Sequence, residues 1–184
     1  MKYLLYAEGG EGIGSGHLRR IANLIRTLKL SENYICLFEN KTQYSFYTQE
    51  NIKCSSLDKI KDEFFFEYFI IDSKKPREDL LKLLRECFNK LILIDNNSKI
   101  SNDASLLITP SYYSSNLNFI KKESLECSGY KYIILNPIIN NFIWTPKKYK
   151  LISFGGEDPN NLTLAVLKKL KRTGKIRNTK VIIG

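Results

Sequence analysis

Short, continuous apolar runs alternate with stretches of helical periodicity along most of the chain. The runs predict buried strands, and the stretches in which apolar residues recur every three or four positions predict amphipathic helices. Strands are predicted at residues 3–7, 34–38, 52–55, 68–72, 90–95 and 105–109, and helices at residues 17–30, 41–50 and 76–88. Apolar strands that alternate with helices are typical of a parallel sheet covered on both faces. The pattern therefore predicts an α/β fold.

The last forty residues repeat this pattern on a smaller scale. After a polar, irregular stretch at 111–130 and a connection at 136–146, the sequence predicts a strand at 149–154, a glycine loop, a helix at 160–172 and a strand at 180–183. One strand–helix–strand unit is too small to bury both faces of a sheet. We therefore expect two domains, residues 1–145 and residues 146–184, the second being the beginning of a larger, truncated domain.

The net charge of +10 comes from 29 Lys and Arg residues against 19 Asp and Glu residues. Such a surplus favours solubility and attracts anions. The basic residues are spread along the chain, and their densest cluster, Lys168, Lys171 and Arg172, falls in a predicted helix, where it is typical of a solvated face. No recognition motif for nucleic acid accompanies the charge, so a nucleic-acid partner is not expected.

Four widely spaced cysteines and one histidine do not form a zinc-binding pattern, so the sequence predicts reduced thiols, no metal site and no cofactor. No apolar stretch approaches the roughly 20 residues of a membrane span, and the apolar start of the chain is too short for a signal peptide. These features predict a cytoplasmic protein without a membrane partner.

The stretch with the clearest chemical potential is the glycine-rich loop at residues 9–16, between the first predicted strand and the first helix. Glycines let backbone N–H groups approach a ligand, and the helix start that follows offers unpaired donors to an anion. The spacing departs from the dinucleotide-binding fingerprint and places His17 at the helix start. The positive end of the helix disfavours a charged imidazole, so a neutral His17 able to accept a proton is one reading. A histidine that only caps or packs is the other.

This stretch also resembles a known family. Gly14-Ser15-Gly16-His17, with Arg20 one turn later, is similar to the opening of the hydrolases that act on flagellin and spore-coat sugars. Two predicted strand ends, Ile70-Ile71-Asp72 and Ile94-Asp95-Asn96, resemble strand ends of that family. The most specific match is residues 153–163, Ser-Phe-Gly-Gly-Glu-Asp-Pro-Asn-Asn-Leu-Thr, which is close to the family's second-domain opening.

The resemblance implies the glycosyltransferase B architecture of two Rossmann-like domains, of which this chain carries the N-terminal domain and the start of the nucleotide-binding domain. It implies an enzyme that releases UDP from UDP-2,4-diacetamido-2,4,6-trideoxy-β-L-altropyranose, on the pseudaminic acid pathway of bacterial surface-sugar biosynthesis. His17 is the implied base that activates a water for attack on the anomeric carbon. The implied substrate contacts are Gly14, Ser15, Gly16, Arg20, Asp72, Asp95, Gly155 and Gly156.

Alternatives remain at each of these positions. Asp72 and Asp95 fit equally a strand end tied to a neighbouring helix, and Gly155 with Gly156 fits an ordinary tight turn. Glu8 and Asn96 stand where the family has Asp, and Lys74 stands where family members often carry a Tyr near the substrate, so the resemblance leaves the sugar open. A glycosyltransferase of the same architecture and an inactive fragment are the alternative functions.

Overall fold

The fold is known from a computed structural model, which describes residues 2–10, 12–60, 65–75, 77–96, 103–110, 125–143, 145–155, 158 and 160–183. A seven-stranded sheet dominates it, with strand order β3-β2-β1-β4-β5-β6-β7 and every neighbouring pair parallel. Its strands are β1 (Tyr3–Ala7), β2 (Tyr34–Phe38), β3 (Cys54–Ser56), β4 (Phe66–Asp72), β5 (Phe88–Ile94), β6 (Leu106–Thr109) and β7 (Leu125–Ser128). The order of the first six strands is that of a Rossmann fold. The predicted Rossmann-like α/β class is confirmed.

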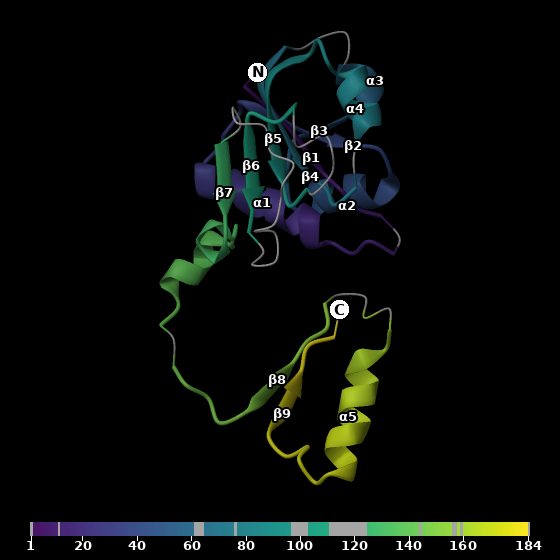
Figure 1. The fold of residues 1–184 in the computed structure, drawn as a ribbon, viewed down its shortest axis with the longest axis vertical. Coiled ribbons are helices and arrows are strands. Elements are labelled where there is room, and N and C mark those ends of the chain that lie inside the picture. The colour runs from purple at the N-terminus through teal and green to yellow at the C-terminus, as the bar shows by residue number, and fades with distance from the viewer. Residues whose placement is uncertain are drawn as a thin grey trace.

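Helices cover both faces of this sheet, as Figure 1 shows. They are α1 (Gly16–Leu28), α2 (Lys41–Gln49), α3 (Leu57–Ile60) and α4 (Glu78–Leu83). Two short 3-10 helices, η3 (Tyr130–Tyr132) and η4 (Pro137–Asn141), follow β7. A second, two-stranded parallel sheet pairs β8 (Lys150–Ile152) with β9 (Thr179–Val181), and helix α5 (Leu162–Arg172) connects these strands. Strands β8 and β9 do not join the seven-stranded sheet.

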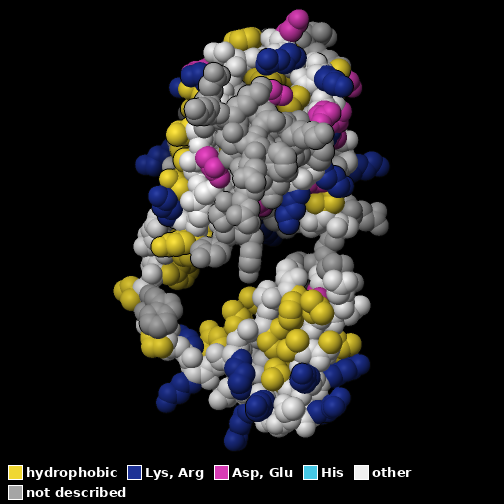
Figure 2. All heavy atoms as spheres, in the orientation of Figure 1, with side chains coloured by type: hydrophobic (Ala, Val, Ile, Leu, Met, Phe, Trp, Pro, Cys, Tyr) yellow, Lys and Arg dark blue, Asp and Glu magenta, His cyan; other side chains and the backbone are white. Residues whose placement is uncertain are grey.

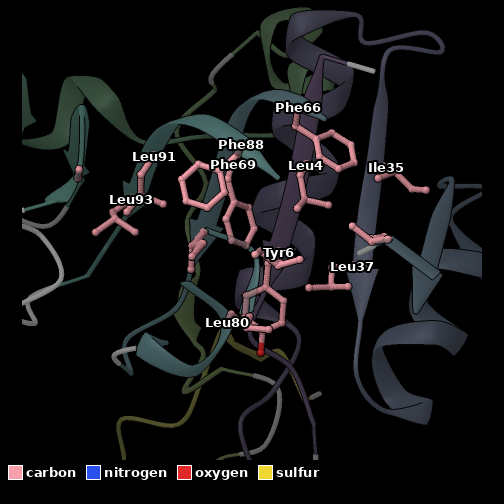
Figure 3. Close-up of a cluster of buried hydrophobic side chains, with 14 of the residues drawn as sticks. Leu4, Tyr6, Ile35, Leu37, Phe66, Phe69, Leu80, Phe88, Leu91 and Leu93 are labelled. Atoms are coloured by element: carbon pink, nitrogen blue, oxygen red, sulfur yellow. The ribbon is translucent and has the colours of Figure 1, made fainter. Parts of the chain in front are cut away.

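The strands are apolar on both sides because alternate residues enter two separate cores. Leu4 and Tyr6 of β1 point into a cluster with α3 and α4, whereas Leu5 and Ala7 point into a cluster with α1 and α2. Figure 3 shows the first cluster, in which the rings of Phe69 and Phe88 pack at 5.2 Å between centroids. The continuous apolar runs in the sequence are thus explained by burial on both faces.

The structure corrects two predicted elements. The helix predicted at 76–88 ends at Leu83, because the chain turns through a hydrogen bond from the Cys87 N–H to the Leu84 carbonyl and then enters β5 at Phe88. The stretch predicted as irregular at 111–130 contains strand β7, whose mixed polar sequence suits an exposed sheet edge. The rest of that stretch, residues 111–124, lies outside the described residues.

Candidate functional site

The candidate site lies at the carboxyl edge of the large sheet, between β1 and β4. These strands are neighbours, with Ala7 opposite Asp72, but the chain leaves β1 toward β2 on one side and reaches β5 from β4 on the other. At such a switch in strand order the loops that follow the two strands diverge, and open α/β sheets bind ligands there. The loop before α1 and the segment after β4 both begin at this point.

Four of the residues expected from the sequence meet at this edge. His17 and Arg20 come from the first turn of α1, Asp72 is the last residue of β4, and Asp95 follows β5 directly. The Nδ1 atom of His17 lies 2.6 Å from Oδ1 of Asp72. Asp72 is fully buried, and the His17 side chain is 10% exposed. His17 and Asp72 are 55 residues apart in the sequence. They meet because the start of α1 and the end of β4 lie at the same edge of the sheet.

The carboxylate of Asp72 determines how the imidazole is oriented. A carboxylate only accepts hydrogen bonds, so Nδ1 of His17 carries the proton and donates it to Asp72. With the proton on Nδ1, Nε2 is the nitrogen that can accept a hydrogen bond when the ring is neutral. Within the part of the chain that the structure describes, Nε2 has no hydrogen-bond partner.

The guanidinium of Arg20 binds two carboxylates at once. Its Nε donates to Oδ2 of Asp72 at 2.6 Å and its Nη2 to Oδ1 at 2.7 Å, a bidentate pair. Nη1 and Nη2 also donate to Oδ2 of Asp95, at 3.3 and 3.2 Å. Burial alone lowers the pKa of Arg20. The hydrogen bonds that Arg20 donates to Asp72 and its attraction to that carboxylate, followed by those to Asp95, outweigh burial and raise that pKa. Arg20 thus stays charged and is fully engaged with the two acids.

Asp95 reaches Arg20 through an unusual backbone conformation. Its φ is +56°, in the left-handed region that Asp and Asn tolerate better than most other residues. The backbone N–H of Asp95 donates to the Ile108 carbonyl on β6 at 2.8 Å, so the turn is held from the neighbouring strand. These contacts fit the alternative interpretation. In it, Asp72 and Asp95 tie the ends of their strands to a neighbouring helix, which is α1.

Glu8 holds the segment after β4, a role that the sequence analysis missed. It is 7% exposed and accepts hydrogen bonds from the Ser73 hydroxyl at 3.0 Å and the Lys74 N–H at 3.2 Å. Burial raises the pKa of Glu8, but the hydrogen bond from Ser73 and the charge of Lys75 more than offset this, so the net pKa is lowered. The signal available in the sequence was an acid placed directly after a buried strand.

Three amide side chains fix the rest of the edge. Asn96 donates through Nδ2 to the Ser73 carbonyl at 2.9 Å, which anchors the segment after β4 from the other side. Asn40, the N-cap residue of α2, donates to the Gly9 carbonyl at 2.7 Å, and Gln43 of α2 donates to the Ala7 carbonyl at 2.8 Å. Both ends of the strand–loop junction are therefore positioned by hydrogen bonds to backbone atoms.

The glycine loop borders a pocket of about 860 Å³. Gly14, Ser15 and Gly16 line it on one side, and Ser153, Phe154 and Gly155 line it from the segment after β8. Gly14 has a φ of +76°, a conformation that favours glycine.

The sequence-predicted residues fall into two groups, the pocket lining and the His17 cluster. His17 is absent from the described pocket lining, although both of its sequence neighbours, Gly16 and Leu18, belong to it. Gly156 lies outside the described residues.

Among the described residues, no side chain caps the start of helix α1. Ser15 occupies the N-cap position but makes no side-chain hydrogen bond to the helix backbone, and the first turn has no acidic residue. The unpaired N–H groups of a helix start attract anions. Beside them, the pocket is lined by Arg19, whose guanidinium is exposed and contacts Ser15.

Neither a metal centre nor a membrane-spanning helix is found among the described residues. No group of three or more His, Cys, Asp or Glu side chains there is placed to hold a metal ion. No helix in that part of the chain has the length and apolar character needed to cross a bilayer.

Comparison with known proteins gives one informative match. The chain is similar to an uncharacterized protein of Methanocaldococcus jannaschii, with 31% identity over 210 aligned positions that include 100% of this chain. The chain spans 43% of that protein's length. No protein-family model matches the chain, and no solved structure matches it.

Proposed function

We propose that the chain carries the histidine-bearing half of a nucleotide-sugar hydrolase that releases UDP from a diacetamido-trideoxyhexose. The observation that carries this proposal is the His17–Asp72 pair at the carboxyl edge of the sheet, beside a glycine-lined pocket. A histidine oriented by a buried carboxylate is a recurring arrangement for a general base. The motif resemblance described above supplies the substrate class.

The proposed reaction needs one base and one leaving group. Nε2 of His17 takes a proton from water as the water oxygen bonds to the anomeric carbon. The bond from that carbon to the UDP oxygen breaks, and UDP leaves with the bonding electron pair. Asp72 stabilises the imidazolium that forms, because its carboxylate lies 2.6 Å from Nδ1. A base of this kind contributes roughly 10²–10⁴-fold to a rate.

The pocket fits an anionic ligand of this size. Its volume of about 860 Å³ falls within the range of roughly 300–1,000 Å³ typical of small-molecule sites. The glycines leave the backbone accessible, the start of α1 has no capping side chain, and Arg19 adds positive charge. These features support a diphosphate against the loop. In the proposal, the sugar extends past Gly16 toward His17.

The test is UDP release from UDP-2,4-diacetamido-2,4,6-trideoxy-β-L-altropyranose by the full-length protein that carries this chain, compared as wild type, His17→Asn and Thr27→Ala. Thr27 lies at the exposed end of the same helix and serves as the matched control. We expect the His17 variant to lose at least about 100-fold in rate and the control to keep the wild-type rate. Absence of UDP release by the wild type, or equal rates for all three proteins, contradicts the proposal. A sugar product attached to an added acceptor rather than free would assign the transferase alternative instead.

A further inference from the structure

The resemblance implies that Arg20 and Asp95 contact substrate, but the structure shows both side chains already occupied. Three of the guanidinium nitrogens of Arg20 donate to Asp72 or Asp95, at distances of 2.6–3.3 Å. The Arg20 side chain is 18% exposed and Asp95 is 20% exposed. A substrate that used either residue would have to break contacts that satisfy buried charges, which is costly.

The same contacts link Asp95 to His17. Asp95 binds Arg20, Arg20 binds Asp72, and Asp72 binds Nδ1 of His17. Nη2 of Arg20 also lies 3.1 Å from Nδ1, so the imidazole N–H and the guanidinium compete for Oδ1 of Asp72. Asp72, Arg20 and Asp95 therefore all lie close enough to act electrostatically on the proton at Nδ1 of His17.

We propose that Arg20 and Asp95 are positioning residues that control how readily His17 takes a proton, and are not substrate ligands. Two carboxylates and one guanidinium leave one net negative charge beside the ring. Neutralising Asp95 removes the surplus and makes protonation harder. Removing the charge of Arg20 doubles the surplus and makes protonation easier.

Other charged groups near His17 are unaffected by these changes. Glu8, after β1, interacts electrostatically with the ring and is itself paired with Lys75 at 3.5 Å, after β4. Arg19, the next residue but one along α1, contacts Ser15. Because these partners stay in place, the difference between two variants reports on the substituted charge.

Asp95→Asn is a suitable probe because it changes charge and little else. Asn is isosteric with Asp and adopts the left-handed conformation found at this position, where φ is +56°. Arg20→Gln is the second probe, and its effect has the opposite sign. Glu50→Gln is the matched control, since Glu50 pairs with Arg26 at the other end of the same helix α1.

The measurement exploits the presence of one histidine in the whole chain. With ¹³C- and ¹⁵N-labelled histidine, a single imidazole resonance follows the protonation of His17 as pH changes. We expect its titration midpoint to fall by roughly 0.5–1 pH unit in Asp95→Asn and to rise in Arg20→Gln, on the scale of one charge a few ångströms away. Glu50→Gln should leave it unchanged. A midpoint in Asp95→Asn that equals the control or rises overturns the proposal, and Arg20→Gln decides it if Asp95→Asn fails to fold.

The catalytic consequence rests on the proposed hydrolase function, but the titration does not. If the chain releases UDP, the acid limb of the pH–rate profile of Asp95→Asn should move to lower pH by the same shift, with KM unchanged. A substrate-ligand role predicts instead a raised KM with an unmoved acid limb. If no UDP is released, the hydrolase proposal fails, while the titration midpoints still decide the role of Arg20 and Asp95.

Discussion

The chain contains two strand–glycine-loop–helix units whose helices begin in opposite ways. At the start of α5, Asp158 accepts hydrogen bonds from the backbone N–H groups of Leu162 and Thr163, at 2.9 and 2.8 Å. At the start of α1, the N-cap residue Ser15 makes no such hydrogen bond, and none of the other described residues is seen to cap the helix. The pocket borders both loops, and among the described residues an acid caps the start of α5, whereas the first turn of α1 contains no acidic residue. The loop after β8 therefore provides a stable helix start, and the loop after β1 a surface suited to an anion.

The two units also differ in how their helices pack. Helix α1 buries five residues, including His17, whereas α5 has no fully buried residue. Figure 2 shows apolar side chains of the second unit at its surface, among Lys and Arg side chains. Leu151, Leu164 and Ile182 are each more than half exposed. His17, which the proposed function requires to hold a fixed geometry, thus lies in the unit with the larger core.

The largest expected effect on stability comes from creating a cavity in the core of the first unit. Phe69 of β4 is 0% exposed, and Phe69→Ala should lower the free energy of unfolding by about 3–5 kcal/mol. Leu164 of α5 is 53% exposed, and Leu164→Ala should change it by less than about 0.5 kcal/mol. Urea unfolding followed by circular dichroism measures both. Equal effects of the two variants contradict the contrast between the units.

A smaller effect is expected at the junction that Glu8 holds. The pKa of Glu8 is lowered in the folded protein from an ordinary value of 4.5, so its ionised form stabilises the fold. This contribution is complete above about pH 4.5 and is lost as the pH falls through the lowered pKa. Glu8→Gln should cost roughly 1–2 kcal/mol at pH 7 and flatten the decline in stability toward pH 3.

Glu32→Gln is the control for that measurement, because Glu32 is exposed. It should leave the free energy of unfolding at pH 7 unchanged, and the decline in acid should keep its wild-type slope. If Glu8→Gln shows the same acid decline as the wild type in urea unfolding at each pH, the junction is not held by the Glu8 carboxylate.

The smallest effect is expected from the helix starts themselves. Asp158→Ala removes the cap of α5 and should increase hydrogen exchange several-fold at the first-turn amides of that helix. Ser15→Ala should leave exchange in α1 unchanged, because Ser15 makes no capping hydrogen bond. Amide exchange measured by NMR on both variants compares the two loops directly. Faster exchange in Ser15→Ala together with unchanged exchange in Asp158→Ala would reverse the assignment of the capped and uncapped starts.

The sheet could be predicted from the sequence because burial on both faces leaves a clear trace. Ile70 and Ile71 point into different cores, and both must be apolar. Strand β7 left no such trace, since Glu126 and Ser128 lie at an exposed edge. Helix α4 was predicted too long because the periodic leucines continue past Leu83, whereas the turn into β5 depends on contacts with β4.

The site could be predicted only in part, for a related reason. Asp72 and Asp95 stand at the ends of predicted parallel strands, so the sequence was enough to place both acids at one edge of the sheet, together with His17. That Arg20 bridges the two acids depends on a contact across 52 and 75 residues, which sequence spacing does not reveal. The expectation of a neutral His17 rested on the helix dipole alone. It did not consider Asp72, whose carboxylate lies 2.6 Å from Nδ1 of the ring.

The central claim is that the imidazole of His17, held by Asp72, faces the reacting carbon of a nucleotide sugar. A crystal structure of the chain with the non-hydrolysable phosphonate analogue of the UDP-sugar tests it most directly. We expect the diphosphate against Gly14 and Gly16, and a water within about 3.2 Å of Nε2 of His17 and in line with the anomeric carbon. A ligand bound in the pocket with Leu18 between the sugar and the imidazole would contradict it.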